Sequence, residues 1–391
     1  MSLASRLSRA VFVSVSAVTL ASCEDLFFVP VPFPTHLTPV PVARAFSFVE
    51  VQASSNHVCG LTATGELFCW GGNDEGQVGR APLGESCNGS PCEQEPQRVE
   101  GVPLLARVRL TAGAPRTCGL TAAGQAWCWG FGVGGQLGDG LGETSYIPRQ
   151  VAGSHAFADL TIGSGHSCGR TATGAVWCWG VGSNGAFGNG QQYAVSSIPV
   201  RVADSLTFTD VRVGDQHSCG ITTAGSSACW GSAWYGAIGN GVLGNSNPAL
   251  YFASPTPVVT GELFTQIVVG SSYSCGLTAA GRTYCWGAGY AMGTGDSGSA
   301  SPVPIASAHI FESIYGGNNH ACGLTAIGDL YCWGDNFVGM LGDGTDKPRL
   351  GPVKVRIPEP VTQVSDHPSC AVTVTGKLYC WGPYERRQHP R

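Results

Sequence analysis

Apolar and polar residues alternate in short stretches along this chain, and residues 157 to 202 show the pattern clearly. Residues 157 to 163 (FADLTIG) place apolar side chains at alternating or nearly alternating positions and end in glycine, which predicts a first strand. Second and third strands are predicted at 166 to 171 and 176 to 180, joined by a tight turn. Residues 199 to 202 (PVRV) predict a short outer strand, since proline is tolerated at a sheet edge.

The same pattern recurs in seven copies, each a variation on C-G-L-T-x-x-G-x-x-x-C-W-G, whose starts lie 47 to 59 residues apart. Such a period is typical of repeat architectures, in which each unit buries its apolar face against its neighbours. Each copy contributes aromatic residues that suit a packed strand. The sequence therefore predicts an all-β fold, a seven-bladed β-propeller built from four-stranded antiparallel blades.

Nine residues separate the two cysteines of each copy. Folding the hairpin about its turn places them opposite each other, where a Cα separation of about 5.5 Å suits a disulfide. Zinc favours shorter cysteine spacing with further ligands. Metal binding therefore stays an alternative to a disulfide only for an eighth pair, Cys87 and Cys92, in the longest loop between repeats. We expect no metal or cofactor, an oxidising compartment, and disulfides that join Cys59 with Cys69, Cys118 with Cys128, Cys168 with Cys178, Cys219 with Cys229, Cys275 with Cys285, Cys322 with Cys332, Cys370 with Cys380, and Cys87 with Cys92.

The last repeat lacks an outer strand of its own. Six repeats carry a proline-led outer-strand signature, but the seventh ends at Trp381 and Gly382 without one. The same signature occurs near the start of the chain, from Pro39 to Val42 (PVPV). An open propeller would leave a strand edge that recruits other chains. We therefore predict that this N-terminal strand completes the last blade.

The N-terminus has the features of a targeting segment. Arg6 and Arg9 precede an apolar run at residues 10 to 21, which is too short for a stable membrane span and is typical of a secretory signal. The run ends in Leu-Ala-Ser-Cys, which resembles a bacterial lipobox and implies cleavage before Cys23 and acylation of its thiol. An ordinary signal peptide is the alternative. The pairing above uses every cysteine except Cys23.

These features predict four segments: a lipoprotein signal peptide at 1–22, a lipidated proline-rich linker at 23–36, the propeller at 37–382 and a tail at 383–391. Proline fixes φ, so the linker favours an extended stalk. We expect the mature protein to be anchored at the outer membrane or cell surface through Cys23, or to be secreted. Membrane contact is expected through the lipid alone, and the propeller is expected to be a monomer.

Composition narrows the functional classes. The chain has 57 glycines among 391 residues and only 12% charged residues, which fits tight turns and buried strands. Its formal net charge is −5, without a cluster of Lys and Arg. Binding to nucleic acid needs a basic surface. We therefore expect no nucleic-acid partner.

Four short motifs resemble the regulator of chromosome condensation repeat: Phe-x-x-Val-x-x-Gly, His-x-Cys-Gly-Leu-Thr, Cys-Trp-Gly, and Gly-x-Leu-Gly-Asp-Gly, the last at 135–140 and 339–344. The resemblance covers residues 39 to 382 and implies a seven-bladed propeller. The family's eukaryotic founder is a nucleotide exchange factor on chromatin, but this chain has an export signal, many cysteines and no basic tail. Secreted bacterial relatives include a β-lactamase-inhibitory protein that binds through one propeller face, so the resemblance favours protein binding.

Few side chains in the sequence form a pattern typical of catalysis. No G-x-S-x-G motif occurs, and the glycine-rich run at 129 to 135 lacks the Gly-Lys-Ser/Thr of a phosphate loop. Four repeats place a histidine two residues before their first cysteine, but other residue types interrupt this ring, so we expect half-buried histidines that bond backbone groups rather than a metal site. The residues at this position are His57, Arg116, His166, His217, Tyr273, His320 and Pro368.

Aromatic residues after the repeat tryptophan offer the best candidate site. Trp234, Tyr290 and Phe337 lie four residues after it, Tyr235 adjoins the first, and Phe131 is nearby in its own repeat. Equivalent positions in successive blades share one rim, so these side chains predict an arc that binds a partner. The alternative is that they pack between blades as part of the core.

We therefore expect a non-catalytic binding scaffold at the cell envelope that engages a protein or a glycan. An enzyme acting on an envelope glycan is the alternative, and it would need two carboxylates about 5 to 10 Å apart near the central channel, without a basic partner. Guanine-nucleotide exchange rests on the family name alone and does not fit an exported protein.

Overall fold

The structure is a computed structural model that describes residues 36–42, 48–87, 89–110, 113–203, 205–244, 250–289, 292, 298–365, 367 and 369–382, with the backbone alone for 36–42. The predicted signal peptide, Cys23 and the predicted C-terminal tail lie outside the described residues. Among the residues that are described, no helix is long and apolar enough to cross a membrane.

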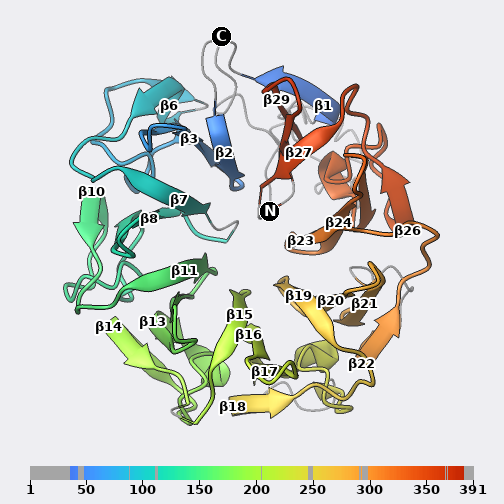
Figure 1. Cartoon of the computed structure of the whole chain (residues 1–391). Helices are drawn as coiled ribbons and strands as arrows, with labels where there is room; N and C mark the ends of the chain where they lie inside the picture. The colour runs from blue at the N-terminus through green and yellow to red at the C-terminus, as the bar shows by residue number, and fades with distance from the viewer. Residues whose placement is uncertain are drawn as a thin grey trace, which may run out of the picture. The chain divides into compact units, whose positions relative to one another are not determined.

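Seven antiparallel sheets form the blades of a propeller, and the first strand of each lies nearest the centre (Figure 1). Blades 1 to 4 consist of β2 (Phe48–Ala53), β3 (His57–Thr62), β4 (Leu67–Gly72) and β6 (Ser90–Arg98) with the short β5 (Ser86–Cys87); β7 (Leu105–Leu110), β8 (Arg116–Thr121), β9 (Ala126–Gly130) and β10 (Ser145–Gln150); β11 (Phe157–Ile162), β12 (His166–Thr171), β13 (Val176–Gly182) and β14 (Ala194–Arg201); and β15 (Phe208–Val213), β16 (His217–Thr222), β17 (Ser227–Ser232) and β18 (Tyr251–Pro257). Blades 5 to 7 consist of β19 (Phe264–Val269), β20 (Tyr273–Thr278), β21 (Thr283–Gly287) and β22 (Ser299–Pro304); β23 (Ser313–Gly316), β24 (His320–Leu324), β25 (Leu330–Gly334) and β26 (Arg349–Lys354); and β27 (Val361–Val364), β28 (Cys370–Thr373), β29 (Leu378–Gly382) and β1 (His36–Val42).

The predicted fold class is confirmed, including the closure of the last blade by the N-terminal strand. β1 pairs antiparallel with β29, with Val40 opposite Cys380 and Val42 opposite Leu378. The strand begins at His36, three residues before the predicted start at Pro39. Both ends of the chain therefore contribute to one sheet, and blade 7 has its fourth strand.

The outer strands are longer than the sequence predicted. In blade 3 the fourth strand begins at Ala194 rather than Pro199, because the third strand continues past Gly180 to pair Gly182 with Ala194. A register shift between Cys178 and Gly180 separates the two paired stretches. Such a bulge re-aims a strand without ending its pairing, so the proline signature marks only the second stretch.

All eight predicted disulfides are present. In each repeat the two cysteines face each other directly across the second and third strands, as Cys168 and Cys178 do. Their Cα separations are 4.0 to 4.1 Å, closer than the expected 5.5 Å and typical of an antiparallel pair that does not exchange hydrogen bonds. A closed loop of this size stabilises a fold by about 3 kcal/mol in the chain-entropy model. So many disulfides indicate an oxidising, extracellular environment.

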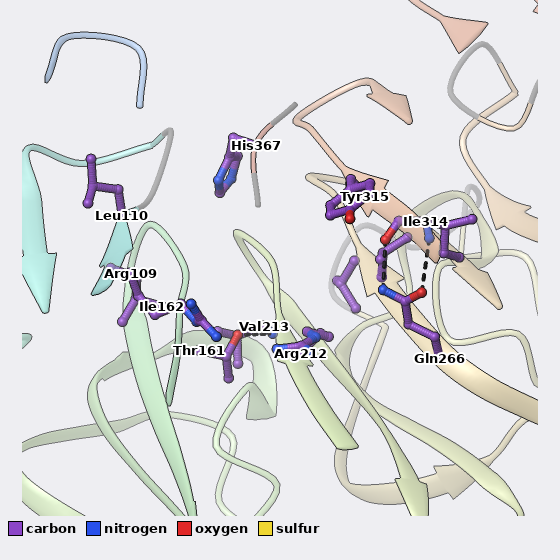
Figure 2. Close-up of a pocket in the computed structure, with 13 residues that line it drawn as sticks. Arg109, Leu110, Thr161, Ile162, Arg212, Val213, Gln266, Ile314, Tyr315 and His367 are labelled. Atoms are coloured by element: carbon purple, nitrogen blue, oxygen red, sulfur yellow. Dashed lines mark hydrogen bonds between the residues drawn. The ribbon is translucent and has the colours of Figure 1, made fainter. Parts of the chain in front are cut away.

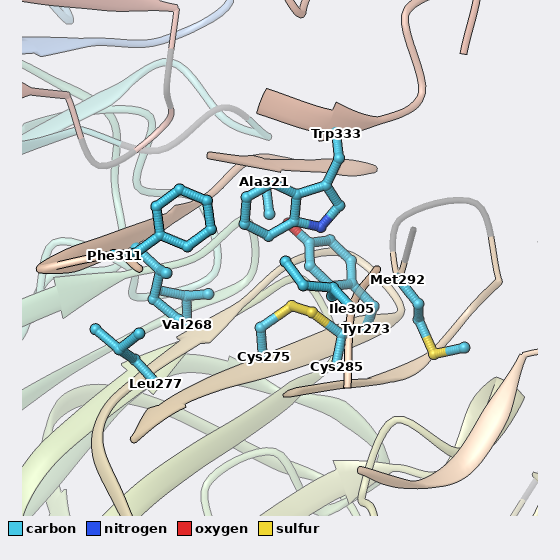
Figure 3. Packing of buried hydrophobic residues seen from close by; sticks show 11 residues of the cluster. Val268, Tyr273, Cys275, Leu277, Cys285, Met292, Ile305, Phe311, Ala321 and Trp333 are labelled. Atoms are coloured by element: carbon cyan, nitrogen blue, oxygen red, sulfur yellow. A yellow bond between two sulfur atoms is a disulfide. The ribbon is translucent and has the colours of Figure 1, made fainter. Parts of the chain in front are cut away.

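The repeat tryptophans join neighbouring blades. The indole N–H of Trp286 donates to the carbonyl of Ala237 in the preceding blade at 2.9 Å, and Trp179 donates to Gln136 at 3.0 Å in the same way. Gly239 allows this approach, since a Cβ there would lie 2.7 Å from the Trp286 nitrogen. Figure 3 shows the next interface along, where Trp333 and Phe311 pack on the disulfide layer of blade 5. The core is therefore a ring of interfaces, each built from two repeats.

Candidate interaction face

One end of the propeller carries two sets of loops, which we call the loop face. Strands alternate in direction, so the turn after each first strand and the loop after each third strand lie at the same end. Backbone hydrogen bonds join the two sets within a blade, from Val181 to Gly165 at 2.8 Å in blade 3 and from Ser232 to Gln216 at 2.9 Å in blade 4. The hairpin turns between second and third strands lie at the opposite end.

The loops after the third strands are held in a fixed, strained conformation. In three blades they contain a short turn whose central residue is not glycine but has a positive φ: 56° for Asn184, 56° for Tyr235 and 67° for Val338. This conformation is unusual, above all for a β-branched residue, and costs about 1 to 3 kcal/mol. The following residue, Gly236 in blade 4, packs so closely on the next blade that a Cβ would lie 2.6 Å from Ala300 Cα. Packing against the next blade therefore holds the strained loop in place.

Trp234 and Tyr235 stand out from this loop. Their rings stack on each other with centroids 5.7 Å apart and an interplanar angle of 9°. Each side chain is 42% exposed. The turn η2 (Trp234–Gly236) positions both rings, and the strained backbone fixes the direction in which they point. The pair is a preformed aromatic surface of the kind that dominates binding interfaces.

The other predicted aromatic residues differ in their exposure. Phe337 occupies the equivalent loop of blade 6 and is 74% exposed. Phe131 is half-buried, and its backbone N–H bonds the carbonyl of Pro115. Tyr290 lies outside the described residues. The alternative that these side chains fill the core between blades is therefore wrong for Trp234, Tyr235 and Phe337.

The loop face carries further exposed aliphatic and aromatic side chains that the sequence analysis missed. Val133 lies four residues after Trp129 in blade 2 and is exposed, so the spacing used for the aromatic residues would have found it. Tyr193 and Val195 are also exposed, at the loop-face end of β14. No sequence signal marks them, because that part of the strand was not predicted. We call Val133, Tyr193, Val195, Trp234, Tyr235 and Phe337 the apolar rim.

The central channel is lined on one side by alternating charges. Arg109 in β7 forms ion pairs with Glu50 of blade 1 at 2.7 Å and with Asp159 of blade 3 at 3.2 Å. Arg212 of blade 4 continues the series, at 3.3 Å from Asp159 and 3.2 Å from Asp210. Burial alone would raise the pKa of Asp159, but the guanidinium groups of Arg212 and Arg109 outweigh it and hold that pKa below its usual value.

On the opposite side of the channel, glutamine amides take the place of the ions. Gln266 accepts a hydrogen bond from the backbone N–H of Ile314 at 2.9 Å and donates to its carbonyl at 2.7 Å, as the dashed lines in Figure 2 show. Gln363 makes the same two bonds to Val51, at 3.1 and 3.3 Å. These amides bridge neighbouring blades, so the polar groups of the channel serve to join first strands.

A cavity of about 560 Å³, counting the part open to solvent, lies in this channel. Arg109, Thr161 and Arg212 line one side, and apolar residues with Gln266 line another (Figure 2). Asp159 is ion-paired with both of the lining arginines, Arg109 and Arg212. An unpaired carboxylate couple, which the glycan-hydrolysing alternative requires, is therefore not formed by Glu50, Asp159 and Asp210.

The histidines two residues before the first cysteine are fully buried, not half-buried as predicted. In blades 1, 3 and 4 the Nε2 atom bonds a hydroxyl group of the next blade: His57 lies 2.7 Å from Thr117, and His166 and His217 lie 2.9 Å from Ser218 and Ser274. His217 also bonds the backbone of Tyr273, as the sequence analysis expected of these histidines. Burial lowers the pKa of His57 and His166 to about 3 and that of His217 to about 4. We call His57, His166 and His217, together with their hydroxyl partners, the histidine seam. Across the described ranges, no three His, Cys, Asp or Glu side chains are grouped as metal ligands would be.

The sequence matches the family described as "Regulator of chromosome condensation (RCC1) repeat" over residues 48–77, 157–186 and 311–339, and again over 64–114, 123–169, 173–221 and 328–370. Together these matches cover more than half of the chain.

Two curated relatives are much longer than this chain. The E3 ubiquitin-protein ligase HERC2 of Homo sapiens is 25% identical over 245 residues, which are 61% of this chain and 5% of the relative. The probable E3 ubiquitin-protein ligase HERC4 of Rattus norvegicus is 26% identical over 253 residues, 64% of this chain and 18% of the relative. The chain thus spans under a fifth of either protein.

Two solved structures share the fold at low identity. Human WBSCR16 superimposes with a TM-score of 0.73 at 18% identity, covering 88% of this chain and 89% of the other. Yeast RCC1 (Prp20), in its structure with Kap60 bound, superimposes with a TM-score of 0.70 at 17% identity, covering 86% and 80%. These likenesses describe the fold alone.

Proposed function

Because this chain belongs to the regulator of chromosome condensation (RCC1) repeat family, we propose that it is a non-catalytic binding scaffold that engages a partner protein through its loop face. The observation that carries the proposal is the exposed Trp234–Tyr235 stack on a strained, packed loop. Aromatic anchors that are already rigid lose little conformational entropy on binding. The fold itself assigns no chemistry, so the proposal depends on this surface.

The chemistry of the apolar rim favours a protein over a glycan. Val133 and Val195 add exposed aliphatic side chains to the same loop face. Exposed apolar side chains gathered on one face are typical of protein interfaces. Sugar sites instead combine an aromatic ring with polar groups that bond hydroxyls.

We further propose that the propeller is a bacterial lipoprotein displayed at the cell envelope through Cys23. The disulfides suit an exported protein, and Cys23 is the cysteine left over from the eight pairs. A propeller tethered in this way would present the loop face to proteins outside the cytoplasm. This arrangement supports binding over nucleotide exchange.

The Cys23→Ser substitution is expected to release the protein from the membrane fraction and to abolish incorporation of labelled palmitate, because the thiol that carries the acyl chains is lost. Fractionation and palmitate labelling of cells expressing the full chain measure both effects. The Cys87→Ala/Cys92→Ala double variant is the control and should stay in the membrane fraction. Palmitate label on the Cys23→Ser protein would contradict lipidation at this site.

The Trp234→Ala/Tyr235→Ala double variant should lose at least tenfold in affinity for the partner protein, because the main aromatic anchor is removed. Its free energy of unfolding should change by about 0.5 kcal/mol or less, since both side chains are exposed. The partner is captured by cross-linking from envelope extract, and its affinity for each variant is then measured by biolayer interferometry.

The matched control is Ile327→Ala, which alters a hydrophobic side chain that is 75% exposed on a hairpin turn at the end opposite the loop face. This variant should bind like the wild type. One portion of the extract is treated with protease before capture. A binding partner that survives protease indicates a glycan, and equal binding by the double variant places the interface elsewhere; either result contradicts the proposal.

A further inference from the structure

Arg116 replaces histidine in blade 2 at the position that forms the histidine seam in blades 1, 3 and 4. Its place at the start of β8, opposite Gly130, matches that of His57 opposite Gly71 in β3. The side chain is fully buried. Its Nη2 donates to the carbonyl of Gly163 in blade 3 at 2.7 Å, and its Nε and Nη1 have no hydrogen-bond partner.

The hydroxyl group of Ser167 in blade 3 is the group with which Arg116 would be expected to form a hydrogen bond. It lies opposite Trp179 in β12, in the register that Thr117 has opposite Trp129 in β8. At the neighbouring interfaces this position bonds the histidine of the preceding blade. The Ser167 hydroxyl is fully buried and also has no partner. Three donor groups of Arg116 and Ser167 are therefore buried without partners, namely Nε and Nη1 of Arg116 and Oγ of Ser167. Nδ1 of His166, whose ring lies near enough to Arg116 to feel its charge, is a fourth buried atom without a partner.

The charge at this interface is also unbalanced. Burial lowers the pKa of Arg116 to about 9, which still leaves the guanidinium positive at neutral pH. Of the described carboxylates, none forms an ion pair with it. A buried charge is strongly destabilising unless it is compensated.

We propose that a chloride ion, or another small monovalent anion, binds between blades 2 and 3 on the Arg116 guanidinium and the Ser167 hydroxyl. The unpartnered groups of Arg116 and Ser167 can all donate a hydrogen bond, and arginine has no acceptor atom. An anion accepts bonds from several donors and neutralises the charge. A water molecule neutralises nothing and brings two donors that need acceptors of their own. The site would fix one blade interface and is independent of the proposed partner binding.

Thermal unfolding of the full chain tests this proposal in sodium chloride and in sodium gluconate at equal ionic strength. Chloride should raise the melting temperature of the wild type above its value in gluconate, by about 2 °C for each tenfold rise in concentration once the site is saturated. The Arg116→His variant restores the histidine–hydroxyl pair of the neighbouring interfaces and should melt at the same temperature in both salts. A chloride-specific rise that persists in this variant, or is absent from the wild type, would overturn the site.

Crystals soaked in sodium bromide give a second test that does not depend on how a variant folds. An anomalous peak is expected within hydrogen-bond distance of Arg116 Nε or Nη1 and of Ser167 Oγ. The Ser167→Ala variant should show a weaker peak or none. A wild-type map with only a water molecule between these groups overturns the proposal.

Discussion

Removing β1 is expected to destabilise the whole propeller and to make it aggregate. A chain that begins at residue 43 leaves β29 with an unpaired edge along the stretch that now faces Val40, Pro41 and Val42. At about 1 kcal/mol for each hydrogen bond, the loss is on the order of 3 to 5 kcal/mol. The exposed edge then offers a template for other chains. Chemical denaturation measures the stability, and light scattering measures the association.

The matched control is a chain that begins at His36, which keeps the strand and differs only by these seven residues. A synthetic peptide of sequence HLTPVPV, added to the shortened chain, should restore part of the lost stability by strand addition. Equal denaturation midpoints for the two chains would mean that the closing strand contributes nothing. A peptide without effect would mean that the loss arises from another cause.

The sequence predicted correctly those features of the fold that depend on the residues of a single repeat. The spacing of Cys168 and Cys178 determines a hairpin register, because only a centred turn places both sulfurs opposite each other. The closing strand was predictable because a signature missing after Gly382 reappears near Pro39. The outer strand of blade 3 was predicted too short, because the bulge after Cys178 allows pairing to resume where no residue pattern signals it.

Contacts between blades were much harder to predict. The ion pair of Arg109 with Glu50 and the bond of Trp179 to Gln136 join residues more than forty positions apart. They depend on how neighbouring sheets stack, which no single repeat specifies. The same limit explains why the histidine partners were missed. For the candidate site, sequence spacing found Trp234 and Phe337, but their exposure is a property of the packed ring.

Acid is expected to unfold this protein well above the pH at which its carboxylates become protonated. His57, His166 and His217 are buried as neutral imidazoles, with pKa values lowered by burial to about 3, 3 and 4 from the ordinary value of 6.5. The unfolded chain binds these protons below pH 6.5, whereas the folded chain does not until pH 3 to 4. The free energy of unfolding is therefore highest above pH 6.5, where these imidazoles are neutral in both states. It decreases as the pH falls towards 4, by at most about 1.4 kcal/mol per pH unit for each histidine.

Urea denaturation between pH 4 and 8 measures this slope. The His217→Gln variant keeps a nitrogen that can donate to Ser274 but cannot be protonated, so its stability should fall less steeply and match or exceed that of the wild type near pH 5. His309→Gln is the control, since His309 is half-buried on Tyr331 outside the histidine seam, and it should keep the wild-type slope. A His217→Gln protein as acid-sensitive as the wild type would mean that this histidine does not drive the transition. In that case His57 and His166, which are buried as neutral imidazoles in the same way, would have to account for it.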